Sequence, residues 1–193
     1  MARPVTADDH GPACLIVAGL GSLAPLLLGT GPAGLAPAAL ALVLLAGRIA
    51  WQDLTDFTIP DSATLALALV GVAWRVAAAG EAGEGLPSTF ALLGLDALLC
   101  GGALWVLREI YYRRRGQDGI GLGDVKLAAA GGILVGTGGF AWCLLGASLV
   151  GIVLLLGRRA LAVPGVETIE ARLAFGAVLA PALVLGWLAA LFA

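Results

Sequence analysis

Two short polar segments interrupt an otherwise almost continuous hydrophobic sequence, and their carboxylates are the side chains best suited to chemistry. The first segment, residues 53–61, contains Asp53, Asp56 and Asp61, and the second, residues 121–126, contains Asp124. Two carboxylates held about 4 Å apart repel by roughly 4 kcal/mol at an effective dielectric constant of 20, so one of them keeps a proton. Such a pair can hydrolyse an amide, because the ionised member takes a proton from water while the protonated member donates to the oxyanion.

The composition places these segments in a membrane protein. Of the 193 residues, 60% are hydrophobic and only 12% are charged, and several apolar stretches are about as long as a bilayer core is thick. The fold class that we predict is all-α, a multi-pass membrane protein with about seven transmembrane helices, namely one N-terminal helix and a six-helix core. The net charge of −2 gives no reason to expect nucleic-acid binding. The predicted spans are residues 13–28, 34–51, 62–79, 88–108, 125–136, 139–157 and 173–192.

The first span is the one with a competing interpretation, because Gly19, Gly21 and Pro25 interrupt it. A cleaved signal peptide is the alternative to a retained anchor. The segment before it carries Arg3 against two aspartates, which is a poor signal-peptide start, so we expect a retained anchor.

The basic residues indicate an orientation. A seven-span topology with the N-terminus inside brings almost all of them to the cytoplasmic face, as the positive-inside rule requires, with Arg75 toward the other face. Both polar segments then reach the cytoplasmic face together. The residues on that face are Arg3, Arg48, Arg108, Arg113, Arg114, Arg115, Lys126, Arg158, Arg159 and Arg172.

The polar residues next to the candidate pair also have structural interpretations. Asp61 and Ser62 are expected to cap the helix that begins there, after Pro60 has fixed an extended backbone. Lys126 is expected to extend to the lipid headgroups rather than to alter a carboxylate. Gly121 and Gly123 are expected to allow a tight turn and a close approach of substrate to Asp124.

The remaining polar groups within the spans are expected to be structural. Asp96 lies inside the fourth span and needs a partner, for which Arg75 on the third span is the candidate. The small residues Ala128, Gly132 and Gly136, spaced by four, predict close helix packing behind Asp124. Arg113–Arg115 are expected to bind anionic lipid.

No cofactor or metal is expected. Cys14, Cys100 and Cys143 are isolated and predict buried thiols rather than a disulfide framework or a zinc site. The single histidine, His10, lies near the N-terminus and has no neighbouring ligand spacing.

The two segments together resemble the prepilin peptidases, membrane-embedded aspartyl proteases that process type IV pilin and related precursors. The shared pattern is an aspartate at a helix end, Ile-Pro after five residues, two further spans, and Gly-x-Gly-Asp-x-Lys opening a helix rich in Gly and Ala. The resemblance implies that Asp53 and Asp124 are catalytic and that Pro60 and the second motif, Gly121, Gly123 and Lys126, support them. Residues 173–181 are similar to the family's Pro-Phe-Gly-Pro segment, with both prolines replaced.

The short link between the first two spans indicates which type of the family this chain resembles. Residues 29–33 alone join the first two spans, so the cysteine-rich methyltransferase insert of larger members is missing and the short, peptidase-only type is indicated. We therefore expect an N-terminal tail and anchor over residues 1–33 and an aspartyl peptidase core over residues 34–193, in the cytoplasmic (inner) membrane with the active site toward the cytoplasm. The implied substrate is a prepilin-like precursor with a basic leader and an apolar helix, and membrane lipids are the other expected partners.

Two other functions remain open on the sequence. One is an intramembrane protease of the presenilin or signal-peptide-peptidase type, whose Pro-Ala-Leu motif is similar to Pro181-Ala182-Leu183, although its Tyr-Asp motif is absent here. The other is a non-enzymatic transport or assembly subunit whose aspartates are interfacial or bind protons.

Overall fold

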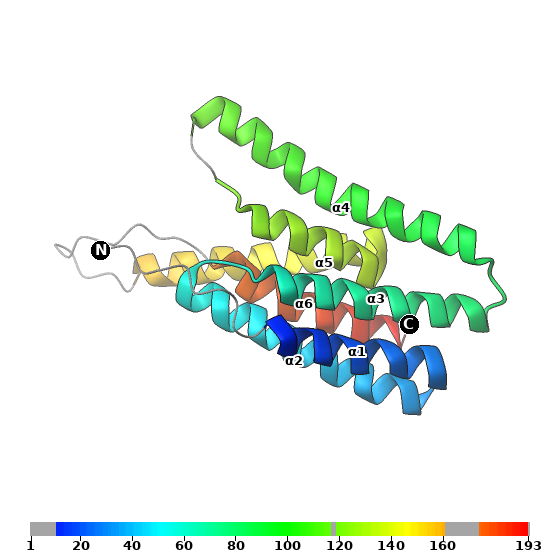
Figure 1. Cartoon of the computed structure of the whole chain (residues 1–193). Helices are drawn as coiled ribbons and strands as arrows, with labels where there is room; N and C mark the ends of the chain where they lie inside the picture. The colour runs from blue at the N-terminus through cyan, green and yellow to red at the C-terminus, as the bar shows by residue number, and fades with distance from the viewer. Residues whose placement is uncertain (1–10, 117–118, 161–173, 193) are drawn as a thin grey trace.

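The chain folds into helices joined by short turns, and no strand occurs among the residues that the computed structural model describes, which are 11–116, 119–160 and 174–192. The predicted all-α, multi-pass fold class is confirmed. Figure 1 shows the helices packed side by side with their axes roughly aligned. They are α1 (Gly11–Leu28), α2 (Pro32–Asp56), α3 (Asp61–Glu81), α4 (Leu86–Arg115), α5 (Leu122–Ala160) and α6 (Phe175–Ala190).

The surface of this bundle is suited to lipid. Four helical stretches are long and apolar enough to cross a bilayer, at residues 33–56, 61–81, 86–115 and 122–157, and α1 and α6 are shorter apolar helices. Large apolar side chains such as Leu27, Trp142 and Val153 are strongly exposed on the outside, which is unfavourable in water and favourable in a hydrocarbon core.

Helix α5 contains the two predicted spans 125–136 and 139–157, separated by a break at Gly136. Gly136 has φ 72° and ψ 167°, outside the helical region and favourable only for glycine. A Cβ placed on Gly131 would lie 3.1 Å from Cδ2 of Phe140, whereas nine residues along a straight helix span about 13 Å. The chain therefore folds back within α5 (Figure 1). Its first part, residues 122–135, is about 21 Å long and crosses only part of a 30 Å bilayer core.

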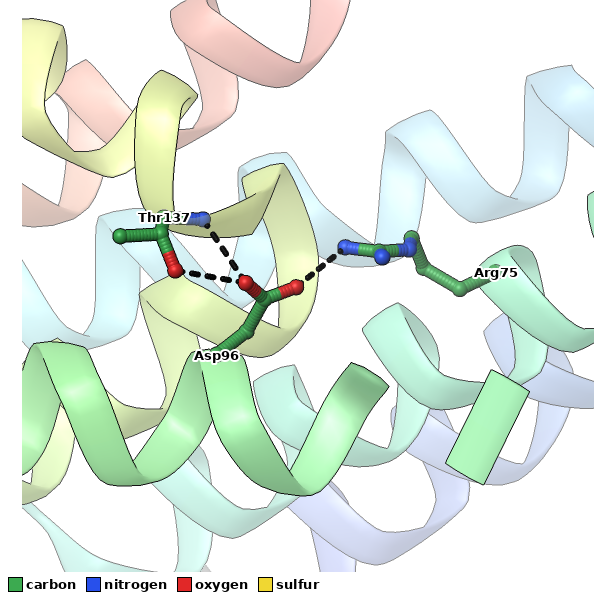
Figure 2. Close-up of polar contacts among 3 residues, drawn as sticks. All are labelled: Arg75, Asp96 and Thr137. Carbon is green, nitrogen blue, oxygen red and sulfur yellow. Dashed lines mark hydrogen bonds and ion pairs between the residues drawn. The ribbon is translucent and has the colours of Figure 1, made fainter. Parts of the chain in front are cut away.

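A polar cluster holds this break in place (Figure 2). The Oδ1 atom of Asp96 accepts hydrogen bonds from the backbone N of Thr137 at 3.1 Å and from its Oγ1 at 2.6 Å. Its Oδ2 accepts one from Nη1 of Arg75 at 3.1 Å. The predicted Asp96–Arg75 pair is confirmed. Thr137 was not anticipated, and its bonds show that Asp96 also caps the second part of α5, whose first N–H groups have no acceptor within the helix.

Replacement of Asp96 by alanine is expected to destabilise the fold by about 3 kcal/mol, because Arg75 and the Thr137 N–H then remain unpaired within the membrane. Unfolding of the purified protein in detergent, followed by circular dichroism, measures this. The double variant Asp96→Ala/Arg75→Ala should recover part of the loss. An unchanged unfolding midpoint for Asp96→Ala would show that the cluster contributes nothing to stability.

Small residues bring α4 and the first part of α5 into close contact. A Cβ on Gly132 would lie 2.5 Å from the backbone O of Asp96, and a Cβ on Gly101 would lie 2.9 Å from Cβ of Ala129. Ala128 is fully buried. The close packing predicted for Ala128 and Gly132 is thus confirmed, whereas Gly136 has a different role and breaks the helix. This contact fixes the element that carries Asp124.

Candidate active site

Asp53 lies in the last turn of α2, inside the helix rather than after it. The sequence placed the end of this span near residue 51, but α2 continues to Asp56 and is closed by Phe57, whose N donates to the backbone O of Asp53 at 3.1 Å. Phe57 takes the left-handed conformation (φ 52°) that ends many helices. The side chain of Asp53 is directed into the bundle, and the residue is only 5% exposed.

The buried carboxylate of Asp53 is held by the N-terminus of α6. The backbone N of Ala177 donates to Oδ2 of Asp53 at 2.8 Å, although the two residues are 124 positions apart. The residue before the helix, Ala174, provides no side-chain cap, so Asp53 takes that role from α2. Gly176 allows the approach, because a Cβ there would lie 3.0 Å from Oδ2 of Asp53. Of the segment 173–181, the described residues from 174 on thus provide the helix start that binds Asp53.

Asp124 lies in the first turn of α5, where the helix dipole favours a carboxylate. The residue is half-buried, and a Cβ on Gly121 would lie 3.3 Å from its Oδ2. Its carboxyl group interacts electrostatically with that of Asp53. The end of α2 and the starts of α3, α5 and α6 all lie at one end of the bundle (Figure 1). The expectation that the two polar segments reach the same side is therefore confirmed.

Ile59, in the turn between α2 and α3, contacts the segments that hold both aspartates. A Cβ on Gly123 would lie 2.9 Å from Cβ of Ile59, and a Cβ on Gly176 would lie 2.7 Å from its Cδ1. Neither Gly121 nor Gly123 has a positive φ, so a left-handed backbone does not explain these glycines. Close approach does: Asp124 lies against Gly121, and Ile59 lies against Gly123.

The neighbouring residues of the two motifs differ in part from expectation. Pro60 precedes α3 with the extended backbone predicted for it (φ −70°, ψ 125°), and it is itself the N-cap residue, so that Asp61 lies inside the first turn of the helix. The capping predicted for Asp61 is therefore wrong. Its carboxylate accepts two hydrogen bonds from Nζ of Lys126, both at 2.8 Å. Lys126 thus ties the start of α5 to the start of α3, rather than only extending to the headgroups as predicted.

Replacement of Lys126 by alanine is expected to change any activity of this site by less than about fivefold, because an exposed ion pair contributes at most about 1 kcal/mol. Both partners are exposed, at 53% for Lys126 and 74% for Asp61. Asp61→Ala should have the same small effect, and the double variant should be no worse than either single one. A loss of 100-fold or more in Lys126→Ala alone would indicate a direct chemical role for the ammonium group.

The arrangement brings together two carboxylates from separate helices, one buried and one half-buried, at the edge of an apolar bundle. Among the described residues, no group of three or more His, Cys, Asp or Glu side chains is placed to hold a metal ion. The sequence did not identify Ile59 as a contact of both Gly123 and Gly176, nor Ala177 as a hydrogen-bond donor to Asp53. The Ile-Pro pair and the glycine of residues 173–181 were the available signals for them.

Comparison with known proteins identifies one family. The model of the type IV leader peptidase family matches residues 38–156, a stretch that includes Asp53, Ile59 and Asp124. No curated protein matches the chain significantly, and no solved structure does.

Proposed function

The chain belongs to the type IV leader peptidase family, and from this premise we propose that it is an aspartic endopeptidase with Asp53 and Asp124 as its catalytic pair. The observation that carries the proposal is that Asp53, at the end of α2, and Asp124, at the start of α5, lie at the same end of the bundle, with Ile59 packed between the segments that hold them. The family match favours this reading over a presenilin-like protease or a non-enzymatic subunit.

The geometry supports a water-mediated cleavage. One carboxylate takes a proton from a water molecule as the water oxygen bonds to the scissile carbonyl carbon, and the other, protonated, carboxyl group donates its proton to the developing oxyanion. Transfer of a proton to the amide nitrogen then breaks the C–N bond and leaves a new carboxyl group and a new amine. The hydrogen bond from Ala177 N to Asp53 keeps one member of the pair oriented through these steps.

The position of the pair supports a particular kind of substrate. Asp53 lies in the last turn of α2 and Asp124 in the first turn of α5, so the carboxylates lie at the ends of membrane-spanning helices rather than midway along them. A peptide bond just outside a hydrophobic helix fits this depth. The substrate that we propose is a prepilin-like precursor whose basic leader precedes an apolar helix, with membrane lipids as the surrounding partner.

The proposed location is the cytoplasmic membrane, with the site facing the cytoplasm. The run Arg113–Arg115 lies at the end of α4, and Figure 1 places that end on the same side of the bundle as the start of α5, which agrees with the positive-inside rule. A cysteine introduced at Thr58 should react with a membrane-impermeant maleimide in inside-out vesicles but not in intact cells. Labelling of this cysteine in intact cells would show that the site faces away from the cytoplasm.

Cleavage of a synthetic precursor tests the function directly. The purified protein, reconstituted in nanodiscs, is incubated with a peptide that has a basic leader and an apolar helix, and the products are identified by mass spectrometry. A single cut between the leader and the apolar helix that persists in EDTA supports the proposal. The absence of any cut in a folded, inserted protein, across precursors with different leaders, contradicts it.

A further inference from the structure

We propose that Ile59 is a positioning residue that sets the separation of Asp53 and Asp124 by acting as a spacer between the helix starts that hold them. This inference rests on the proposed peptidase function, and it assigns to the turn between α2 and α3 a role in the active site.

The first observation is that Ile59 touches both sides of the site. On one side its Cβ, Cγ1 and Cδ1 atoms lie 2.9, 3.3 and 3.4 Å from where a Cβ of Gly123 would be, directly before Asp124. On the other side its Cδ1 and Cγ1 atoms lie 2.7 and 3.1 Å from the corresponding position of Gly176. That same position lies 3.0 Å from Oδ2 of Asp53. One side chain therefore separates the start of α5 from the start of α6.

The second observation is that Ile59 is itself firmly held. The next residue, Pro60, is buried, and its ring fixes φ near −70°. The carbonyl of Pro60 accepts hydrogen bonds from both N and Oγ1 of Thr64, each at 3.1 Å, and Thr64 is buried. Isoleucine is also branched at Cβ and has few rotamers. A stiff side chain on an anchored backbone is suited to act as a spacer.

The third observation is that α5 and α6 also contact each other farther from the pair. A Cβ on Gly131 would lie 2.7 Å from Cδ2 of Leu183. Gly131 is seven residues after Asp124, which is about 10 Å along α5. That contact fixes the helices within the bundle, while Ile59 controls their spacing where the carboxylates lie. Truncation of Ile59 should therefore change the geometry of the pair without unfolding the bundle.

The kinetic test compares two half-buried isoleucines that each pack against a glycine. Cγ2 of Ile133 lies 3.4 Å from where a Cβ of Gly71 would be, and Ile133 lies about 13 Å along α5 from Asp124, so it is the matched control. Ile59→Ala is expected to lower kcat by about 10- to 100-fold with KM changed less than threefold, since a shift of about 1 Å at a reacting pair can cost 100-fold. Ile59→Val should retain most activity, and Ile133→Ala should stay within threefold of wild type. An equal loss in Ile133→Ala, or a loss confined to KM, would overturn the proposal.

A second measurement does not depend on activity. The variant Asp53→Cys/Asp124→Cys is treated with thiol crosslinkers of graded length. The Asp53→Cys and Asp124→Cys variants, each of which adds one thiol to the buried Cys14, Cys100 and Cys143, serve as controls. With Ile59 present, a narrow range of lengths should bridge the two positions, and with Ile59→Ala the range should widen. An identical range in both backgrounds contradicts the spacer role, even if the protein cleaves precursors. If the range widens and the wild-type protein, with both aspartates present, cleaves no precursor, the spacer role stands and the peptidase function is excluded.

Discussion

Replacement of either Asp53 or Asp124 by asparagine is expected to lower kcat for precursor cleavage by about 10³-fold or more. Asparagine keeps the shape of the side chain but neither accepts a proton from water nor donates one as an acid, and each step of the proposed hydrolysis needs both functions. Because the two residues act as one unit, the double variant should be no less active than either single one. Single-turnover cleavage of a fluorescent precursor measures all three variants.

Two other aspartates of the same segment provide the controls. Asp56 is exposed, within 3.4 Å of Thr55 Oγ1, and Asp61 is bonded to Lys126. Asp56→Asn and Asp61→Asn should therefore cleave within about fivefold of wild type. Cleavage that survives in both Asp53→Asn and Asp124→Asn would exclude the two-carboxylate mechanism, and loss of cleavage in Asp56→Asn would move the catalytic role to an exposed residue.

Much of the fold was predictable because a membrane imposes strong constraints on sequence. Long apolar stretches indicate helices, since backbone groups in lipid must be satisfied within each segment. An aspartate inside such a stretch needs a partner, so the pair of Asp96 and Arg75 could be inferred from two isolated charges. The convergence of the segments that carry Asp53 and Asp124 followed from counting spans between them.

The details that escaped prediction depend on contacts between distant segments. The sequence indicated two spans around Gly136, but not that Asp96 caps the second of them through Thr137, because these two residues are far apart in the chain. The end of α2 was placed too early because Gln52 and Asp53 are polar, although Asp53 is buried. Asp61 resembled a helix cap by position, and only the fold brings Lys126 within 2.8 Å of it.

Substitution of Gly176 by alanine is the second change with a large expected effect, a loss of about 100-fold in kcat. The added methyl group would lie 3.0 Å from Oδ2 of Asp53 and 2.7 Å from Cδ1 of Ile59. Both distances are shorter than ordinary van der Waals contacts. The carboxylate must then move away from the N–H of Ala177, and a shift of this size at a catalytic group is enough to cause such a loss. Steady-state cleavage by the reconstituted variant measures it.

The matched control is Gly47→Ala on α2, the helix that carries Asp53, where a Cβ meets nothing within 4 Å. That substitution should leave cleavage unchanged and stabilise the helix by about 0.5–1 kcal/mol, because alanine loses less backbone entropy than glycine on folding. Adding Ile59→Val to Gly176→Ala removes the Cδ1 atom that the methyl group meets, and should restore part of the activity. The contact with Asp53 remains, so recovery should be incomplete. Full activity in Gly176→Ala alone would mean that the start of α6 does not determine where the carboxylate of Asp53 lies.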